Sequence, residues 1–302
     1  MTVPDFQTIM LPLLQAVGDR QIHRVADLID RLADEFRLTE AERAERLPSG
    51  RTPRFTNRVA WARTYLGKAG LLEAPARGAV RITERGSQLL AERPARIDLR
   101  FLTRYPEIVA FRQRSDPGGA VIVDDAPVSA ETPDEAIARA HTQLQAVLAD
   151  EVLTRIKALS PQFFEKLVLE LLVAMGYGGT IQDAAHVVGQ SGDGGIDGVI
   201  KEDKLGLDMI YVQAKRWDNT VGRPTVQAFA GSLQGYRATK GVLITTATFS
   251  TEARDYVERI GTRIVLIDGP TLARLMIEHN VGVAVASNYQ IKRIDSDYFS
   301  EG

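Results

Sequence analysis

The chain has 302 residues, of which 44% are hydrophobic and 25% are charged, and its formal net charge is −2. This length is enough for two domains of ordinary size, each with its own core. The complete lack of cysteine excludes disulfides, thiolate nucleophiles and cysteine-based zinc sites. No apolar run approaches the roughly 18 residues of a membrane span, and the N-terminus lacks the pattern of a secretory signal. We therefore expect a soluble, cytoplasmic protein without a membrane partner.

The charges are unevenly distributed along the chain. Residues 51–96 carry ten Lys or Arg against three Asp or Glu, whereas residues 115–136 carry six acids and no Lys or Arg. A basic surface on the first domain is the electrostatic signature of phosphate binding. The alternative is a solvated, mixed-charge face on an ordinary helical domain.

The first 95 residues show helical periodicity followed by a hairpin pattern. Thr39 and Glu42 form a capping-box pattern, a turn at residues 76–78 separates two short strand-like runs, and a last helix begins at Thr83. The helices are expected at residues 5–18, 23–36, 39–46 and 56–69, and the hairpin strands at residues 71–75 and 79–83.

This order of elements predicts a winged helix-turn-helix domain over residues 1–95. In that fold the helix at residues 56–69 is the recognition helix, so Arg58, Trp61 and Arg63 are candidate DNA contacts, and Arg77 lies at the tip of the wing. A winged helix that serves protein dimerisation is the alternative.

Residues 96–132 are poorly periodic and rich in proline, glycine and aspartate, which predicts a linker with at most one short helix near residues 101–111. Thr132 and Glu135 then form a second capping-box pattern that opens a long helix to about Leu159. Ser160 caps the next helix, which ends before Gly176.

The remainder, within a second domain at residues 133–302, alternates between strands and helices. This alternation is typical of the α/β class and predicts a mixed sheet flanked by helices. The strands are expected at residues 196–200, 209–215, 240–245 and 263–267, and the helices at residues 224–236, 250–260 and 270–278.

Two adjacent strands of this sheet carry the residues with the clearest chemistry. Asp197 lies on the first, and Gln213 and Lys215 lie two residues apart on the second, so these two side chains emerge on one face while Val212 and Ala214 point the other way. A carboxylate, an amide oxygen and an ammonium group at one point suit metal-assisted phosphodiester hydrolysis. The pattern therefore favours a nuclease. The alternative for Asp197 is a turn residue, and for Lys215 a solvated strand-end lysine.

Several blocks around these residues carry a family resemblance. They read GDGGIDG at 192–198, LGLD at 205–208, YVQAKRW at 211–217, VGRP at 221–224, QAF at 227–229 and GVLITT at 241–246. In this order they resemble the PD-(D/E)xK nuclease superfamily and, more specifically, the Mrr restriction endonuclease family, over roughly residues 150–285.

The resemblance implies a type IV restriction activity, in which methylated DNA is cut and unmodified DNA is spared. It implies an N-terminal DNA-binding domain and a Mg²⁺ cofactor bound by Asp197 and Gln213, with Lys215 as the catalytic lysine and Glu165 joining the site from the first helix. Gln213 stands where most of the superfamily has Glu or Asp, which leaves the number of metal ions open. Cutting both strands takes two active sites, so we expect at least a homodimer on double-stranded DNA.

Residues beside the core motif have less specific patterns. Arg223 precedes a helix whose N-terminus could bind a phosphate, and capping is the alternative. Arg216 and Trp217 could contact the DNA backbone, and Asp193 is expected to form a turn or to support the metal ligands.

Two other functions fit the same sequence. One is a structure-directed nuclease that resembles Holliday-junction resolvases and cuts four-way junctions regardless of methylation. The other is a DNA-binding regulator whose nuclease core no longer cuts. The sequence specifies neither the recognised site nor the type of methylation.

Overall fold

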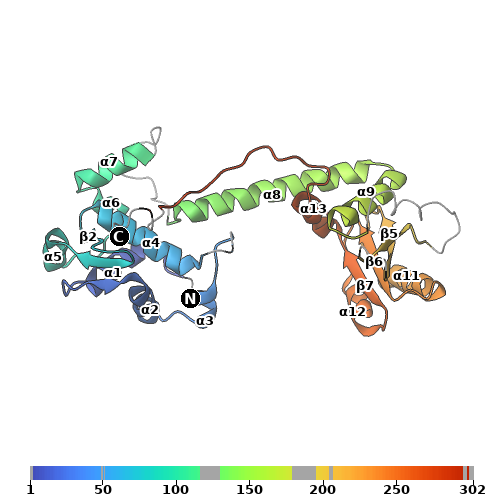
Figure 1. Ribbon diagram of the computed structural model, residues 1–302, viewed down its shortest axis with the longest axis horizontal. Helices are drawn as coiled ribbons and strands as arrows, with labels where there is room; N and C mark the ends of the chain where they lie inside the picture. Colours follow the sequence, from blue (N-terminus) through green and yellow to red (C-terminus); the bar gives the residue numbers. More distant parts are fainter. Residues whose placement is uncertain are drawn as a thin grey trace. The chain divides into compact units, whose positions relative to one another are not determined.

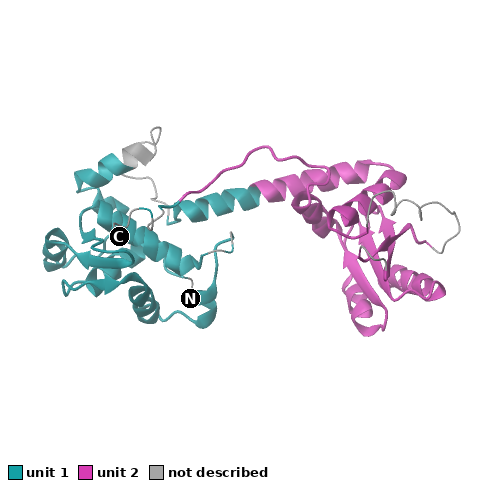
Figure 2. Ribbon diagram, viewed as in Figure 1, with its two compact units in different colours: residues 1–143, 293–302 teal, residues 144–292 magenta. Residues whose placement is uncertain are grey.

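The chain divides into two units, Met1–Gln143 with Arg293–Gly302, and Leu144–Lys292 (Figure 2). The computed structural model describes residues 3–48, 50, 52–115, 130–178, 195–203, 207–294 and 298. No helix in these ranges is long and apolar enough to cross a membrane.

The first unit consists of short helices around a small sheet (Figure 1). Side-chain caps start several of the helices: Asp5 accepts from the backbone amides of Gln7 and Thr8, and the predicted capping box of Thr39 and Glu42 is present. The elements are α1 (Phe6–Ala16), β1 (His23–Arg24), α2 (Val25–Glu35), α3 (Glu40–Ala44), α4 (Arg54–Lys68), β2 (Leu72–Glu73), β3 (Ala79–Ile82), α5 (Glu84–Ala91), α6 (Leu99–Leu102) and α7 (Pro106–Ser115).

The small sheet has the order β1-β3-β2, with antiparallel pairing throughout. The predicted hairpin is present as β2 and β3. Strand β1 was not predicted, since a strand of two residues has no measurable periodicity and is defined only by its pairing with Ala79 and Val80.

The core of the first unit extends beyond residue 95. Ile97, Leu99, Leu102 and Ile108 are buried together with the helices that precede them. The expected linker at residues 96–132 is therefore partly structured as α6 and α7, because its scattered apolar residues dock on a core that local periodicity does not reveal. Residues 116–129 lie outside the described part of the chain.

The second unit is built on a mixed sheet of order β4-β5-β6-β7. Strands β4 and β5 are antiparallel, and β5, β6 and β7 are parallel. The predicted α/β fold is confirmed. The elements from the long helix onward are α8 (Pro133–Ala158), α9 (Pro161–Ala174), β4 (Gly198–Lys201), β5 (Met209–Lys215), α11 (Arg223–Gly235), β6 (Lys240–Thr245), α12 (Thr251–Arg259), β7 (Arg263–Ile267) and α13 (Gly269–Glu278).

Helices cover both faces of this sheet. The second half of α8 packs with α9 and α13 on one face, where Val212 and Ala214 of β5 are buried. On the other face, α11 and α12 pack over Leu243 of β6 and Ile264 of β7. Strand β6 is covered on both sides and reads as a continuous apolar run, as expected for a central parallel strand. The end of β5 is thereby held between two helical layers.

Candidate active site

Asp197 is fixed by two hydrogen bonds to strand β5. Its backbone amide donates to the Val212 carbonyl at 2.9 Å, and its carboxylate Oδ2 accepts from the Ala214 amide at 2.7 Å. The β4–β5 register pairs Gly198 with Val212, so Asp197 stands one step further along, beside Gln213. The carboxylate is therefore positioned by backbone geometry rather than by a flexible loop.

Lys215 is the last residue of β5, and its Nζ lies 3.9 Å from Oδ2 of Asp197. Both side chains keep partial access to solvent, with 26% of Lys215 and 18% of Asp197 exposed. The strand end is anchored from β6, since the Thr245 hydroxyl donates to the Lys215 carbonyl at 2.7 Å. The structure thus brings the Asp197 carboxylate and the Lys215 side chain together at one end of the sheet.

Gln213 lies between them and is buried. Its side-chain amide donates to the backbone carbonyl of Gly195. Gly195 has a φ of +86°, and a Cβ there would collide with the Gln213 side chain, so this turn requires glycine. With the amide nitrogen engaged, Oε1 is the atom of Gln213 able to bind a cation, and its role as a metal ligand stays a prediction.

Glu165 on α9 shares the electrostatic environment of these residues. Burial raises the pKa of its carboxyl, the negative charge of Asp197 raises it further, and Lys215 opposes both effects. Burial also raises the pKa of Asp197, against the Ala214 hydrogen bond and the Lys215 charge. Because burial and the charge of Asp197 both raise the pKa of Glu165, a cation at these two carboxyls would favour their charged forms.

A Mg²⁺ ion would fit this donor set. Mg²⁺ usually takes one or two carboxylates and retains several waters, instead of a complete protein cage. In the described ranges no group of three or more acidic or histidine side chains could hold a metal by itself. Asp197, Glu165 and Oε1 of Gln213 therefore suit an ion that is also bound by water and substrate.

Residues next to the motif serve different purposes. Arg216 donates from Nη1 to the carbonyl of Lys157 at 2.6 Å, in the last turn of α8, so its side chain is committed to the fold. Trp217 is exposed. Arg223 is exposed at the start of α11, and its guanidinium lies 5.3 Å from the Tyr256 ring centroid. Asp193 lies outside the described residues.

The candidate DNA contacts of the first unit fall into two groups. Arg58 and Trp61 on α4 are bound to the first turn of α8: Arg58 Nε donates to Glu135 at 2.9 Å, and Trp61 Nε1 donates to Asp134 at 2.7 Å. Arg63 is half-buried on the same helix, and Arg77 is exposed in the turn between β2 and β3. Their contacts with DNA stay predictions.

Sequence reasoning missed the partners of Arg58 and Trp61. It recognised Thr132 and Glu135 as a helix cap, which they form, but not as a surface that binds α4. The available signal was charge, because an acidic stretch follows a basic one, although charge alone does not indicate which residues meet.

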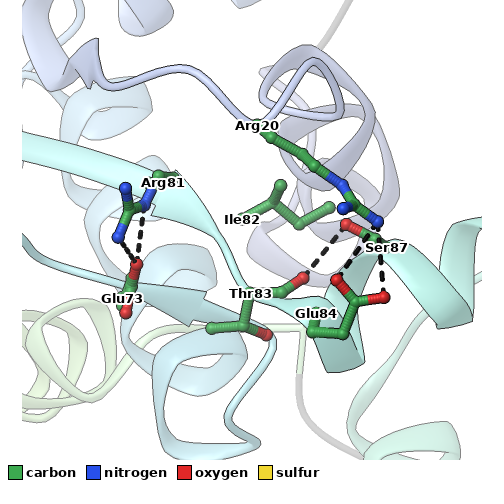
Figure 3. Close-up of a pocket in the computed structure, with 7 residues that line it drawn as sticks. All are labelled: Arg20, Glu73, Arg81, Ile82, Thr83, Glu84 and Ser87. Carbon is green, nitrogen blue, oxygen red and sulfur yellow. Dashed lines mark hydrogen bonds and ion pairs between the residues drawn. The ribbon is translucent and has the colours of Figure 1, made fainter.

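A pocket of about 300 Å³ lies at the base of the hairpin in the first unit (Figure 3). Its two arginines are paired with acids: Arg81 donates to Glu73 at 2.7 Å, and Arg20 lies 3.2 Å from Glu84. With both guanidinium groups neutralised, the pocket has no surplus charge to attract a phosphate.

A mixed sheet with an acid and a lysine at the same edge of adjacent strands is the arrangement expected of a nuclease domain of the restriction-endonuclease class. The family model described as "Restriction endonuclease" matches residues 156–276, and the model of the Mrr N-terminal domain matches residues 6–92. The type IV methyl-directed restriction enzyme EcoKMrr of Escherichia coli (strain K12) is 37% identical over 313 residues, which cover 99% of this chain and 100% of that protein. The chain therefore belongs to the Mrr family of restriction endonucleases.

Two solved structures show weaker likeness. The DNA modification-dependent restriction endonuclease AspBHI is 18% identical with a TM-score of 0.36, over 70% of this chain and 56% of that one. The MspJI restriction endonuclease in complex with a 27-mer oligonucleotide is 22% identical with a TM-score of 0.30, over 68% and 49%.

Proposed function

We propose that this protein is a Mg²⁺-dependent endonuclease that hydrolyses phosphodiester bonds in methylated double-stranded DNA. The observation that carries the proposal is the placement of Lys215 3.9 Å from the fixed carboxylate of Asp197, with the Glu165 carboxyl within electrostatic range of both. Membership of the Mrr family supports the same reaction.

Each residue of the site has a distinct task in this proposal. Asp197, Glu165 and Oε1 of Gln213 would hold the ion, which would supply polarisation of the phosphate and a lowered pKa for a bound water. Lys215 orients the attacking water or balances the charge that develops on the non-bridging oxygens. Gln213 also holds the Gly195 carbonyl, and so keeps the turn before Asp197 in place.

The first unit binds the DNA in this proposal. Helices α1, α2 and α4 with the β2–β3 hairpin and the sheet order β1-β3-β2 are compatible with a winged helix, in which α4 faces the major groove and Arg77 of the wing reaches the backbone. The excess of Lys and Arg at residues 51–96 supports phosphate contacts there. Arg223 is the corresponding candidate on the catalytic unit.

Specificity for methylated DNA is proposed from the relative, which is named a methyl-directed enzyme. A methyl group in the major groove can be read by apolar contact, and a flipped base would need an aromatic pocket.

The test is a cleavage assay with purified protein, Mg²⁺ and the same plasmid in methylated and unmethylated form. Two further reactions contain a chelator, or an immobile four-way junction as the substrate. The proposal predicts cutting of the methylated plasmid alone and no product with chelator. Cutting of the junction regardless of methylation would indicate a structure-directed nuclease. DNA binding without any metal-dependent product would indicate a regulator.

A further inference from the structure

One face of α4 is occupied by the acidic first turn of α8, with every contact inside the first unit. Glu135 pairs with Arg58 at 2.8 Å and with Arg54 at 3.5 Å. Asp134 accepts hydrogen bonds from Asn57 at 3.0 Å and from Trp61 at 2.7 Å. Glu135 is 8% exposed, so its carboxylate is buried in the contact between the turn and α4.

The α4 side of this contact presents groups that bind anions. Arg54, Asn57, Arg58 and Trp61 follow the i, i+3, i+4, i+7 spacing of one helix face. Guanidinium groups form planar donor pairs that match carboxylate and phosphate oxygens equally well, and the amide and indole add neutral donors. We call these four residues the anion face.

The acidic turn accepts only some of the hydrogen bonds that the Arg58 guanidinium donates. Its Nη1 also donates to the backbone carbonyls of Val3 and Pro4, at 2.6 and 3.1 Å. These bonds hold the guanidinium in place independently of Glu135. Loss of the turn would therefore leave the Arg58 guanidinium preorganised, while Arg54 would keep its second ion pair, with Glu45 at 2.5 Å.

An ion-paired contact is a poor way merely to anchor a helix. A buried ion pair adds little net stability over a well-packed apolar contact, because both charges lose their hydration. Charged partners can, however, be exchanged for other anions without a change in the donor geometry. The composition of the contact thus suits exchange better than permanent attachment.

We infer that the anion face is a DNA-phosphate surface for which the acidic turn, Asp134 and Glu135, competes. The inference rests on the proposed DNA-binding role of the first unit and adds its regulation: the chain's own carboxylates occupy Arg58 and Trp61 until a DNA backbone replaces them. Binding of DNA and seating of the turn are then mutually exclusive.

The experiment compares Glu135→Gln with a matched control, Glu131→Gln. Each change removes one negative charge from the same segment, but Glu131 pairs with Arg139 at 3.1 Å, whereas Glu135 pairs with Arg58 of α4 at 2.8 Å. Glutamine also completes a capping box, so α8 still begins at the same place. Binding of the full-length proteins to one DNA duplex is measured without divalent metal at several salt concentrations.

The expected result is about fivefold tighter binding by Glu135→Gln, a typical size for coupling between two sites, with unchanged binding by the control. The salt dependence also becomes steeper by about one phosphate contact. Equal affinities for the two variants would overturn the inference. If thermal unfolding shows that Glu135→Gln is not folded, Asp134→Asn is compared with the control under the same criteria.

Arg63→Ala separates this inference from the proposed function, because Arg63 lies on α4 outside the anion face. Weaker DNA binding by Arg63→Ala, with no gain in Glu135→Gln, would overturn competition by the turn and leave the DNA role of α4 intact. Full DNA affinity in Arg63→Ala, in Arg77→Ala and in Glu135→Gln would overturn both.

Discussion

Burial raises the pKa of both acids in the candidate site from ordinary values of 3.8 for Asp197 and 4.5 for Glu165, and the charge of Lys215 opposes that rise. A carboxyl with a raised pKa keeps its proton to higher pH and binds a cation only above that pKa. As the pH falls, metal binding is therefore lost at a higher pH than it would be at carboxyls with ordinary pKa values.

Lys215→Met removes the opposing charge, so the pKa values of Asp197 and Glu165 rise further. We expect Mn²⁺ binding to be lost at a higher pH in this variant than in wild type. The measurement is calorimetry without DNA, across the acidic and neutral pH range; the part of the profile where binding falls is its acid limb. Lys215→Arg keeps the charge and is expected to keep the wild-type limb. An identical limb in wild type and Lys215→Met would show that the lysine does not face these carboxyls.

Gln213→Glu installs the residue that is usual in the superfamily, and here we expect it to impair the enzyme. Glutamate cannot donate to the Gly195 carbonyl and would place an anion against it. Supporting groups around a metal site typically contribute 10–100-fold in affinity or activity, so cleavage is expected to fall by about that factor. Tighter metal binding with full cleavage would mean instead that the side chain acts only as an oxygen ligand.

Among the secondary-structure elements, the junction of β5 with α8 depends on Arg216. Its hydrogen bond to the Lys157 carbonyl ties the segment after Lys215 to the end of the long helix. Arg216→Met leaves that carbonyl without its donor, which costs about 1–3 kcal/mol. We expect a lower denaturation midpoint in urea and unchanged DNA affinity, with Arg216→Lys intermediate in stability. Weaker DNA binding at unchanged stability would place Arg216 on the DNA instead.

The sequence was sufficient to predict most elements of the second unit. Strands β5, β6 and β7 have the predicted bounds, and the caps at Thr132 and Ser160 mark the starts of α8 and α9. These features are local, since alternation and capping are defined by neighbours along the chain. The proximity of Asp197 and Lys215 could also be anticipated, because adjacent strands fix it.

Contacts between distant segments could not be predicted in the same way. The sequence predicts Arg58 and Trp61 as DNA contacts but gives no sign of their partners Glu135 and Asp134, which bind them across more than 70 positions of sequence. Ile97 and Ile108 join the first core although no periodic pattern includes them. Burial of this kind depends on which surface is available to dock on, and no local pattern encodes that.

For the whole molecule, cutting both DNA strands requires two active sites. We therefore propose that the enzyme acts as a homodimer or a higher oligomer. Co-expression of tagged wild type with untagged Asp197→Ala would yield mixed assemblies, and these are expected to nick a methylated plasmid and to linearise it poorly. Linear product in strict proportion to the wild-type content, with no accumulation of nicked plasmid, would show that one copy cuts both strands unaided.

Asp197 is proposed to act in the chemical step, at a site that cleaves methylated DNA. The most direct measurement compares wild type with Asp197→Asn on one methylated duplex, with binding and single-turnover cleavage recorded in parallel. We expect cleavage to fall by more than about 100-fold, beyond the usual effect of a supporting residue, while binding is retained. Cleavage by Asp197→Asn at the wild-type rate would show that Asp197 takes no part in the reaction.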